Sequence, residues 1–191
     1  MMKESKNGSS KLKLLLLICV LAMSFNQAKA QFYSLKTDAV GWATGTFNLE
    51  AGMTLSYQWS LHVPVYYNPW TFTDNKKIKN ISFLPGVRYW LKETYGSGFF
   101  FGGNAVISRF NFGGIFGNKF RYDGVAFGGG LSAGYSIPIH KQWNLDFELG
   151  GAVVWSRWDK YPCVRCGARL KEDSGVRLIP DKLAVSIIYL F

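Results

Sequence analysis

The sequence predicts an all-β fold, and three observations lead to that prediction. Segments of about nine to fourteen residues alternate between apolar and small or polar side chains. The chain ends on an aromatic residue of such a segment, and no stretch after the leader has the roughly 20 apolar residues of a membrane helix. Because a backbone crosses hydrocarbon only as a helix or a closed barrel, these features favour an eight-stranded antiparallel transmembrane β-barrel.

The first 30 residues have the pattern of a secretory signal peptide. Lysines precede an apolar run from Leu14 to Met23, and Ala28-Lys29-Ala30 matches the small-x-small cleavage motif. The run is too short for a membrane helix, which makes an uncleaved anchor the weaker alternative. We expect residues 1–30 to be removed and residues 31–191 to form one barrel domain, with the net charge falling from +10 to about +6.

Eight segments of the mature chain read as strands with one apolar and one small or polar face. Such strands are long enough to cross a bilayer when tilted, whereas strands of soluble proteins usually have about five or six residues. In chain order they are Tyr33–Val40, Leu49–Tyr57, Ser60–Asn68, Ile81–Leu91, Gly98–Phe110, Val125–Ile137, Trp143–Trp155 and Lys182–Phe191.

The connections between these segments alternate in length. Short turns are expected near Gln58–Trp59, Lys92–Ser97 and Pro138–Gln142, and longer loops at Pro69–Asn80, Asn111–Arg121 and Ser156–Pro180, with a shorter one at Gly41–Phe47. Outer-membrane barrels have short periplasmic turns and long outer loops. Both ends of the mature chain are therefore expected in the periplasm.

Tryptophan gives an independent indication of a membrane. Trp59, Trp90 and Trp143 adjoin the short turns, and Trp42, Trp70, Trp155 and Trp158 adjoin the long loops. Amphipathic rings gather at the two headgroup levels of a bilayer. This placement predicts two aromatic belts and disfavours a soluble periplasmic ligand-binding β-barrel.

The last strand carries a further signal. Val185, Ile187, Tyr189 and Phe191 share one face at a period of two and end on a terminal aromatic. This pattern resembles the C-terminal signal that the barrel assembly machinery reads in outer-membrane proteins.

Four stretches together resemble a known family. They are Tyr67–Lys77 (YNPWTFTDNKK), Arg88–Leu91 (RYWL), Asp159–Gly167 (DKYPCVRCG) and Ser186–Phe191 (SIIYLF). They are similar to a family of small Bacteroidetes outer-membrane barrels with a domain of unknown function, and the likeness spans the mature chain. The resemblance implies an OmpA- or OmpX-like barrel, with some relatives encoded near fimbrial genes, and it implies no activity.

Inward-facing charges are expected to form a buried network. With eight strands the interior is filled by side chains and leaves no water channel, and unpaired charges there would be costly. A path for protons or ions is the alternative interpretation. The residues predicted to face inward are Lys36, Asp38, Glu50, Arg88, Asp146 and Glu148.

The sequence predicts no catalytic, cofactor-binding or metal-binding residues. Its histidines, His62 and His140, both adjoin short turns, so the outer surface lacks a histidine for general-base chemistry. The pair Cys163-x-x-Cys166 could hold zinc shared between two chains, act as a redox pair or form a disulfide. With only two ligands and no βαβ context, we expect a disulfide that closes an outer loop.

These features predict an outer-membrane protein with a structural or surface-binding role, neither a pore nor an enzyme. The expected partners are outer-membrane lipid and lipopolysaccharide, the barrel assembly machinery, and fimbrial or other surface proteins; nucleic acid is not among them. The basic, aromatic outer loops could bind lipopolysaccharide or merely hold neighbouring lipid phosphates. A lipid-modifying outer-membrane enzyme is the alternative.

Overall fold

The structure is a computed structural model of the chain, and it describes residues 33–72, 76–114, 120–162 and 168–191. The predicted signal peptide, residues 1–30, lies outside these ranges, as do Cys163 and Cys166 with their predicted disulfide.

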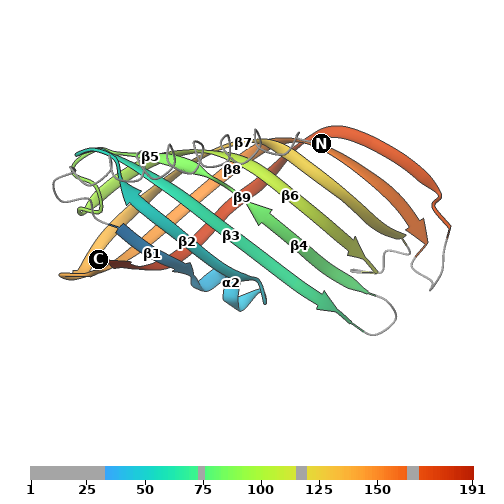
Figure 1. Cartoon of the computed structure of the whole chain (residues 1–191), viewed down its shortest axis with the longest axis horizontal. Coiled ribbons are helices and arrows are strands. Elements are labelled where there is room, and N and C mark those ends of the chain that lie inside the picture. Colours follow the sequence, from blue (N-terminus) through green and yellow to red (C-terminus); the bar gives the residue numbers. More distant parts are fainter. Residues whose placement is uncertain (1–32, 73–75, 115–119, 163–167) are drawn as a thin grey trace, which may run out of the picture. The chain divides into compact units, whose positions relative to one another are not determined.

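The described residues form one closed antiparallel sheet, which confirms the predicted eight-stranded β-barrel (Figure 1). Each strand pairs with its neighbours in the chain, and the pairing of β1 with β9 closes the barrel. The β4 and β5 segments both pair with β3 and β6, so they are two halves of one interrupted strand. The elements are β1 (Tyr33–Asp38), α2 (Ala39–Ala43), β2 (Phe47–Thr54), β3 (Trp59–Thr71), β4 (Lys77–Phe83), β5 (Gly86–Trp90), β6 (Gly98–Gly113), β7 (Phe120–His140), β8 (Trp143–Pro162) and β9 (Lys171–Leu190).

Proline explains the interruption between β4 and β5. Pro85 has no backbone N–H to donate to a ladder, so it breaks the regular pairing. The neighbouring strands hold the break in place, because Leu84 N donates to Pro64 O (3.1 Å) and Ala105 N donates to Pro85 O (2.9 Å).

Alternation along each strand separates the two faces of the barrel wall, as the sequence pattern predicts. In β1, for example, Tyr33 and Leu35 are exposed, whereas Lys36 and Asp38 are buried. The outward face is apolar on every side of the barrel, and the inward face carries most of the buried polar groups. The barrel therefore has an apolar exterior and a polar interior, the reverse of a soluble protein.

The predicted long loops are wrong in extent, because the strands continue through much of them. The β7, β8 and β9 strands have 21, 20 and 20 residues, about twice the length that a tilted membrane strand needs. The β8–β9 ladder runs on to Lys160↔Lys171, far inside the expected loop Ser156–Pro180. On β8 the outward positions there carry the charged Arg157 and Asp159, so the apolar alternation of this strand ends although its backbone pairing does not.

A β-bulge in β9 also interrupts the apolar alternation, so the sequence pattern does not show that the strand continues. Opposite Gly150 and Gly151, β9 places Lys182 and Pro180, which leaves Asp181 as an extra residue. The bulge shifts the alternation by one residue. As a result Val176 and Leu178 are 68% and 79% exposed, on the same face as the odd-numbered Leu183 across the break.

The connection from β1 to β2 contains one turn of helix, α2, in an otherwise all-β described chain. Asp38 caps α2: its carboxylate accepts hydrogen bonds from Val40 N (3.0 Å) and Gly41 N (2.9 Å). In the described ranges, no helix has the length and apolar character needed to cross a membrane.

The tryptophans match the predicted outward placement at five of seven positions. These five are between 41% and 52% exposed on the outside of the barrel: Trp42, Trp59, Trp70, Trp143 and Trp155. Trp90 and Trp158 are corrections to the prediction. Trp90 is 1% exposed and lies inside the barrel, and Trp158 lines an internal cavity, because both occupy inward positions of their strands.

Candidate functional site

Aromatic side chains plug the end of the barrel that carries the short turns, here called the turn end. Trp90, Tyr95, Phe100 and Ile188 form one buried cluster. The Tyr95 ring packs against Trp90 (5.3 Å between centroids), and its hydroxyl lies 2.7 Å from Ser34 Oγ. Since Tyr95 belongs to the connection between β5 and β6, that turn folds into the barrel mouth.

Next to this plug, a layer of charged residues fills the barrel, centred on Glu148. Its Oε2 accepts from Arg88 Nη2 (2.6 Å) and Lys36 Nζ (3.0 Å), and its Oε1 accepts from Lys182 Nζ (2.9 Å) and Ser132 Oγ (2.8 Å). These residues come from β1, β5, β7, β8 and β9. One carboxylate therefore ties five strands together across the interior.

Arg88 links this centre to a second carboxylate. Its Nη1 lies 2.9 Å from Glu50 Oε1, and its guanidinium stacks over the Phe100 ring at 5.0 Å. The Arg88 side chain is 1% exposed. Carboxylates on both sides of the guanidinium therefore neutralise its charge, as a buried arginine requires. Its Nε has no hydrogen-bond partner among the described residues.

The structure places all six residues of the predicted network inside the barrel, with different roles. Lys36, Glu50, Arg88 and Glu148 contact one another directly. Asp146 joins the group through Lys36, whose Nζ lies 4.0 Å from Asp146 Oδ2, the same distance as from Glu50 Oε2. Asp38 caps α2 and also accepts a hydrogen bond from Val185 N (3.1 Å), so it stabilises the β1–β9 junction.

Sequence reasoning missed two members of the layer, Lys182 and His62. Both were visible in the alternation, since Lys182 shares the inward face of Ala184 and Ser186, and His62 that of Ser60. Lys182 begins the predicted last strand, and His62 lies in the predicted strand Ser60–Asn68. His140 is exposed at the end of β7, as its place beside a short turn predicts.

His62 belongs to a Ser–His–Glu array that resembles a catalytic triad. Ser60 Oγ lies 2.6 Å from His62 Nε2, and His62 Nδ1 lies 2.7 Å from Glu50 Oε1. His62 Nδ1 also lies 2.8 Å from Arg88 Nη1, and Ser60 Oγ accepts from Trp90 Nε1 (2.8 Å). Ser60 is 0% exposed and lines none of the described cavities. The array is suited to holding the plug together, because no substrate can reach the hydroxyl.

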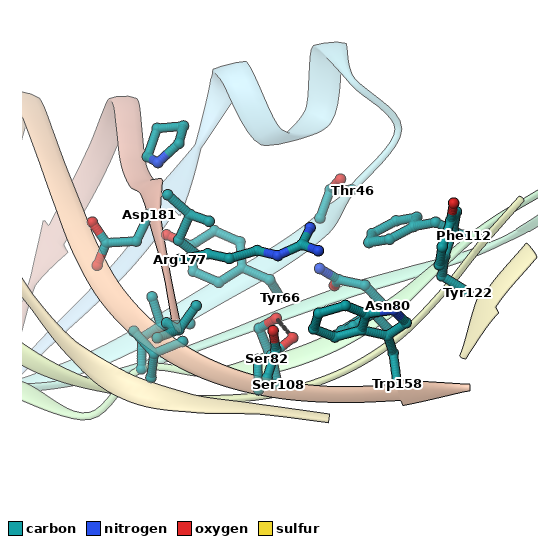
Figure 2. A pocket seen from close by; sticks show the side chains of 18 residues that line it. Thr46, Tyr66, Asn80, Ser82, Ser108, Phe112, Tyr122, Trp158, Arg177 and Asp181 are labelled. Atoms are coloured by element: carbon teal, nitrogen blue, oxygen red, sulfur yellow. Dashed lines mark hydrogen bonds between the residues drawn. The ribbon is translucent and has the colours of Figure 1, made fainter. Parts of the chain in front are cut away.

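The other half of the barrel, toward the ends of the long strands, is hollow. This half, here called the loop end, encloses a cavity of 630 Å³ (Figure 2). The prediction of a completely filled interior is therefore wrong for this half. Many inward residues here are small, and the space between them stays open. At the turn end, the corresponding space is filled by the large side chains of Arg88, Trp90 and Phe100. The small residues include Ser82, Ser108, Ala126, Val154 and Ser156.

The cavity has an apolar floor and a partly aromatic wall. Its floor consists of Leu84, Val106, Ala126 and Val154, which form a buried cluster with Ala152 behind them and with Tyr66, Phe110 and Ile179 packed around it. Phe112, Tyr122 and Trp158 continue the wall toward the loop end. Asp181, the extra residue of the β9 bulge, lies at the side, where its Oδ2 accepts from Asn104 Nδ2 (2.9 Å).

Charged residues at the far tips of β8 and β9 largely pair with one another. Glu172 contacts both Arg157 and Arg169, Arg169 also lies 3.3 Å from Asp159, and Lys171 lies 2.9 Å from Asp173. These pairs are exposed and contribute little to stability. They reduce the free positive charge that the sequence predicted for this rim.

The C-terminal residues lie where the alternation predicts. Val185, Ile187, Tyr189 and Phe191 all follow the outward face of β9, with Ile187 and Phe191 46% and 63% exposed. The Tyr189 ring packs against Trp143 and Phe191, each at 4.9 Å between centroids. Their role as an assembly signal stays a prediction.

Among the residues that the structure describes, no group of three or more His, Cys, Asp or Glu side chains is arranged to hold a metal ion.

The comparison with family models identifies the chain's relatives. Residues 15–191 match the model of DUF3575, described as a protein of unknown function. The chain belongs to this family. The DUF3575 match covers every described strand, so the plugged turn end and the hollow loop end both lie within the family domain. Neither the curated proteins nor the solved structures give a match to this chain.

Proposed function

We propose that this DUF3575 protein is an outer-membrane barrel that binds a ligand at the cell surface without forming a pore or catalysing a reaction. The observation that carries the proposal is the division of the interior. The turn end is filled by the aromatic plug and the charged layer, whereas the loop end holds a 630 Å³ cavity, a volume typical of small-molecule sites. A barrel closed at one end and hollow at the other is a cup.

Several features support an outer-membrane location for the cup. The exterior is apolar, five tryptophans lie on it, and the leader has the pattern of a signal peptide. Short turns at one end and longer strands at the other favour an orientation with the cavity toward the cell exterior. Outer-membrane lipid, lipopolysaccharide and surface proteins such as fimbriae are the partners that such an orientation offers, and the barrel assembly machinery would insert the chain.

The absence of catalysis is part of the proposal and rests on the position of His62. The lipid-modifying enzyme considered as the alternative is expected to use a histidine beside the cavity as its general base. Asp181, the carboxylate among the described lining residues, is held by the Asn104 amide. Among the described residues that line the cavity none is a histidine, and the Ser60–His62–Glu50 array lies in the plugged half.

Thiol labelling of intact cells tests the cup and its orientation together. In a background with Cys163→Ser and Cys166→Ser, the cavity variant Ser108→Cys should react with a small membrane-impermeant thiol reagent. The plug variant Ser60→Cys should react at least roughly tenfold more slowly, because reactivity follows exposure of the thiol. Labelling of Ser108→Cys only after lysis, or equal labelling of both variants, would contradict the proposal.

A further inference from the structure

The described lining of the cavity contains one cation, the exposed Arg177, and among the described residues no carboxylate lies within ion-pair distance of it. Asp173 interacts with it electrostatically from farther away. The Arg177 guanidinium stacks over the Trp158 ring at 4.3 Å. Figure 2 shows the Arg177 side chain reaching across the cavity toward Asn80 and Thr46. An anionic group at this place would complete its pairing.

The rest of the cavity wall is suited to an apolar chain. Below Arg177 the floor is aliphatic. Asp181, the one carboxylate among the described lining residues, lies at the side of the cavity and is directed away from the guanidinium in Figure 2. An anion is attracted at one side of the cavity and repelled at the other, which fixes the direction of an amphiphile. The volume of 630 Å³ suits a drug-sized molecule, so we expect one acyl chain in it.

Beside Arg177, the edge of β9 that faces β1 has no paired strand among the described residues. The β1 strand pairs with β9 only over Ser186–Leu190, and the Asp38 carboxylate caps that pairing at Val185. Beyond this point, the described part of β9 pairs with β8 alone, and α2 packs beside it. Pro180 lies on this unpaired edge, where the missing N–H of proline is tolerated.

This unpaired side lies at an apolar level of the barrel exterior. The β9 residues around it, Val176, Leu178 and Leu183, are between 64% and 79% exposed and point outward. Between β9 and β3, the only described residue that lines the cavity is Thr46, which belongs to the loop after α2. In a membrane this side of the cavity would adjoin the hydrocarbon, so a lipid chain has the shortest path to it.

We infer that the cavity binds a single-chain anionic lipid, a long-chain fatty acid being the simplest. The acyl chain lies on the aliphatic floor, and the carboxylate pairs with Arg177 at the level of Trp158. This inference rests on the proposed function, because it names the ligand class of the same cup.

Native mass spectrometry of the protein purified from membranes tests the inference, since it counts bound lipid by mass. Three probes of one chain length separate the contribution of the headgroup to binding from that of the acyl chain: stearate, stearyl alcohol and stearylamine. We expect one stearate per barrel, bound at least roughly tenfold more tightly than stearyl alcohol, with stearylamine the weakest.

Three variants assign the binding to the cavity. Arg177→Gln should weaken stearate binding roughly tenfold and leave stearyl alcohol unchanged. The matched control Arg157→Gln should change neither, because Arg157 lies on the neighbouring strand, is exposed and pairs with Glu172. Ala126→Phe should fill the floor and weaken both probes, with Ser108→Phe as the substitute if Ala126→Phe does not show the heat-dependent gel shift of a folded barrel.

Each other outcome overturns the inference. If Arg177→Gln still prefers stearate over stearyl alcohol as strongly as the wild type, the arginine does not bind the carboxylate. Stearate binding by Ala126→Phe at wild-type strength places the lipid on the outer surface. A two-chain species without lipid means that the open edge of β9 pairs with a second copy. The thiol labelling is independent, because a reactive Ser108→Cys without stearate binding rejects the ligand class and keeps the cup.

Discussion

The two halves of this barrel use the same alternating strands and reach opposite results. At the turn end the inward positions carry large or charged side chains, such as Glu50, Arg88, Trp90 and Phe100, and beside Glu50 a pocket of only about 10 Å³ remains. At the loop end the inward positions carry small side chains, such as Ser82, Ser108 and Ala126, and a cavity remains. Strand number alone therefore does not decide whether a small barrel is filled; the size of the inward residues does.

The largest expected difference between the halves concerns their arginines. Arg88→Leu should lower the free energy of unfolding by about 3–5 kcal/mol, because it leaves Glu50 and Glu148 buried without their shared partner. Arg177→Leu, in the hollow half, should cost about 1 kcal/mol or less, since it loses only the stacking on Trp158. Urea unfolding of both variants in the same micelles measures the contrast, and equal losses would contradict the division into two halves.

A smaller difference is expected when a side chain is enlarged on β7. Gly134→Val should destabilise by about 1–3 kcal/mol through overpacking. A Cβ atom added at Gly134 would lie 2.3 Å from Phe100 Cζ and 2.5 Å from Phe147 O. Ala126→Val, eight residues earlier on the same face, should change stability by only about 0.5 kcal/mol, because its new methyl groups enter the cavity. Thermal unfolding followed by the gel shift compares the two, and a larger loss for Ala126→Val would mean that the floor is already full.

The smallest expected effect is a pH dependence from the plug. Burial raises the pKa of Tyr95, which lies in the turn outside the strands, to about 12. Above pH 10 the unfolded chain loses this proton while the folded chain keeps it, so stability falls as pH rises toward 12, by about 1.4 kcal/mol per unit. Tyr95→Phe should lack this part of the decline. Unfolding at pH 9, 10 and 11 gives the difference between the two proteins, and parallel curves would show that Tyr95 is accessible to water.

The fold was predictable because its signal is spread over many residues. Alternation in eight segments and the C-terminal aromatic were enough for the all-β class, the strand number and the inward position of six charged residues. The limits of the strands were less predictable. Beyond Arg157 in β8 the outward residues become charged, and apolar alternation cannot report a ladder that continues on backbone hydrogen bonds alone.

The candidate site was less predictable than the fold, because a cavity is defined by what side chains fail to fill. Trp90 and Trp158 both adjoin predicted connections, yet one plugs the turn end and the other lines the cavity. Whether each tryptophan faces the barrel interior or a membrane belt depends on whether it occupies an inward or an outward position of its strand. Arg177 lay in a predicted loop, and its inward direction depends on the bulge at Asp181, which periodicity treats as an interruption.

The bulge in β9 makes the count of residues matter more than their identity. Asp181 and Lys182 are adjacent, yet Asp181 serves the cavity and Lys182 serves the charged layer. Paired without the bulge, the same residues would turn Val176 and Leu178 inward and Arg177 outward. Loss of Asp181 would instead restore a regular ladder with Pro180 and Lys182 opposite Gly151 and Gly150. Every other residue would then keep its face, and the cup would lose only the carboxylate at its side.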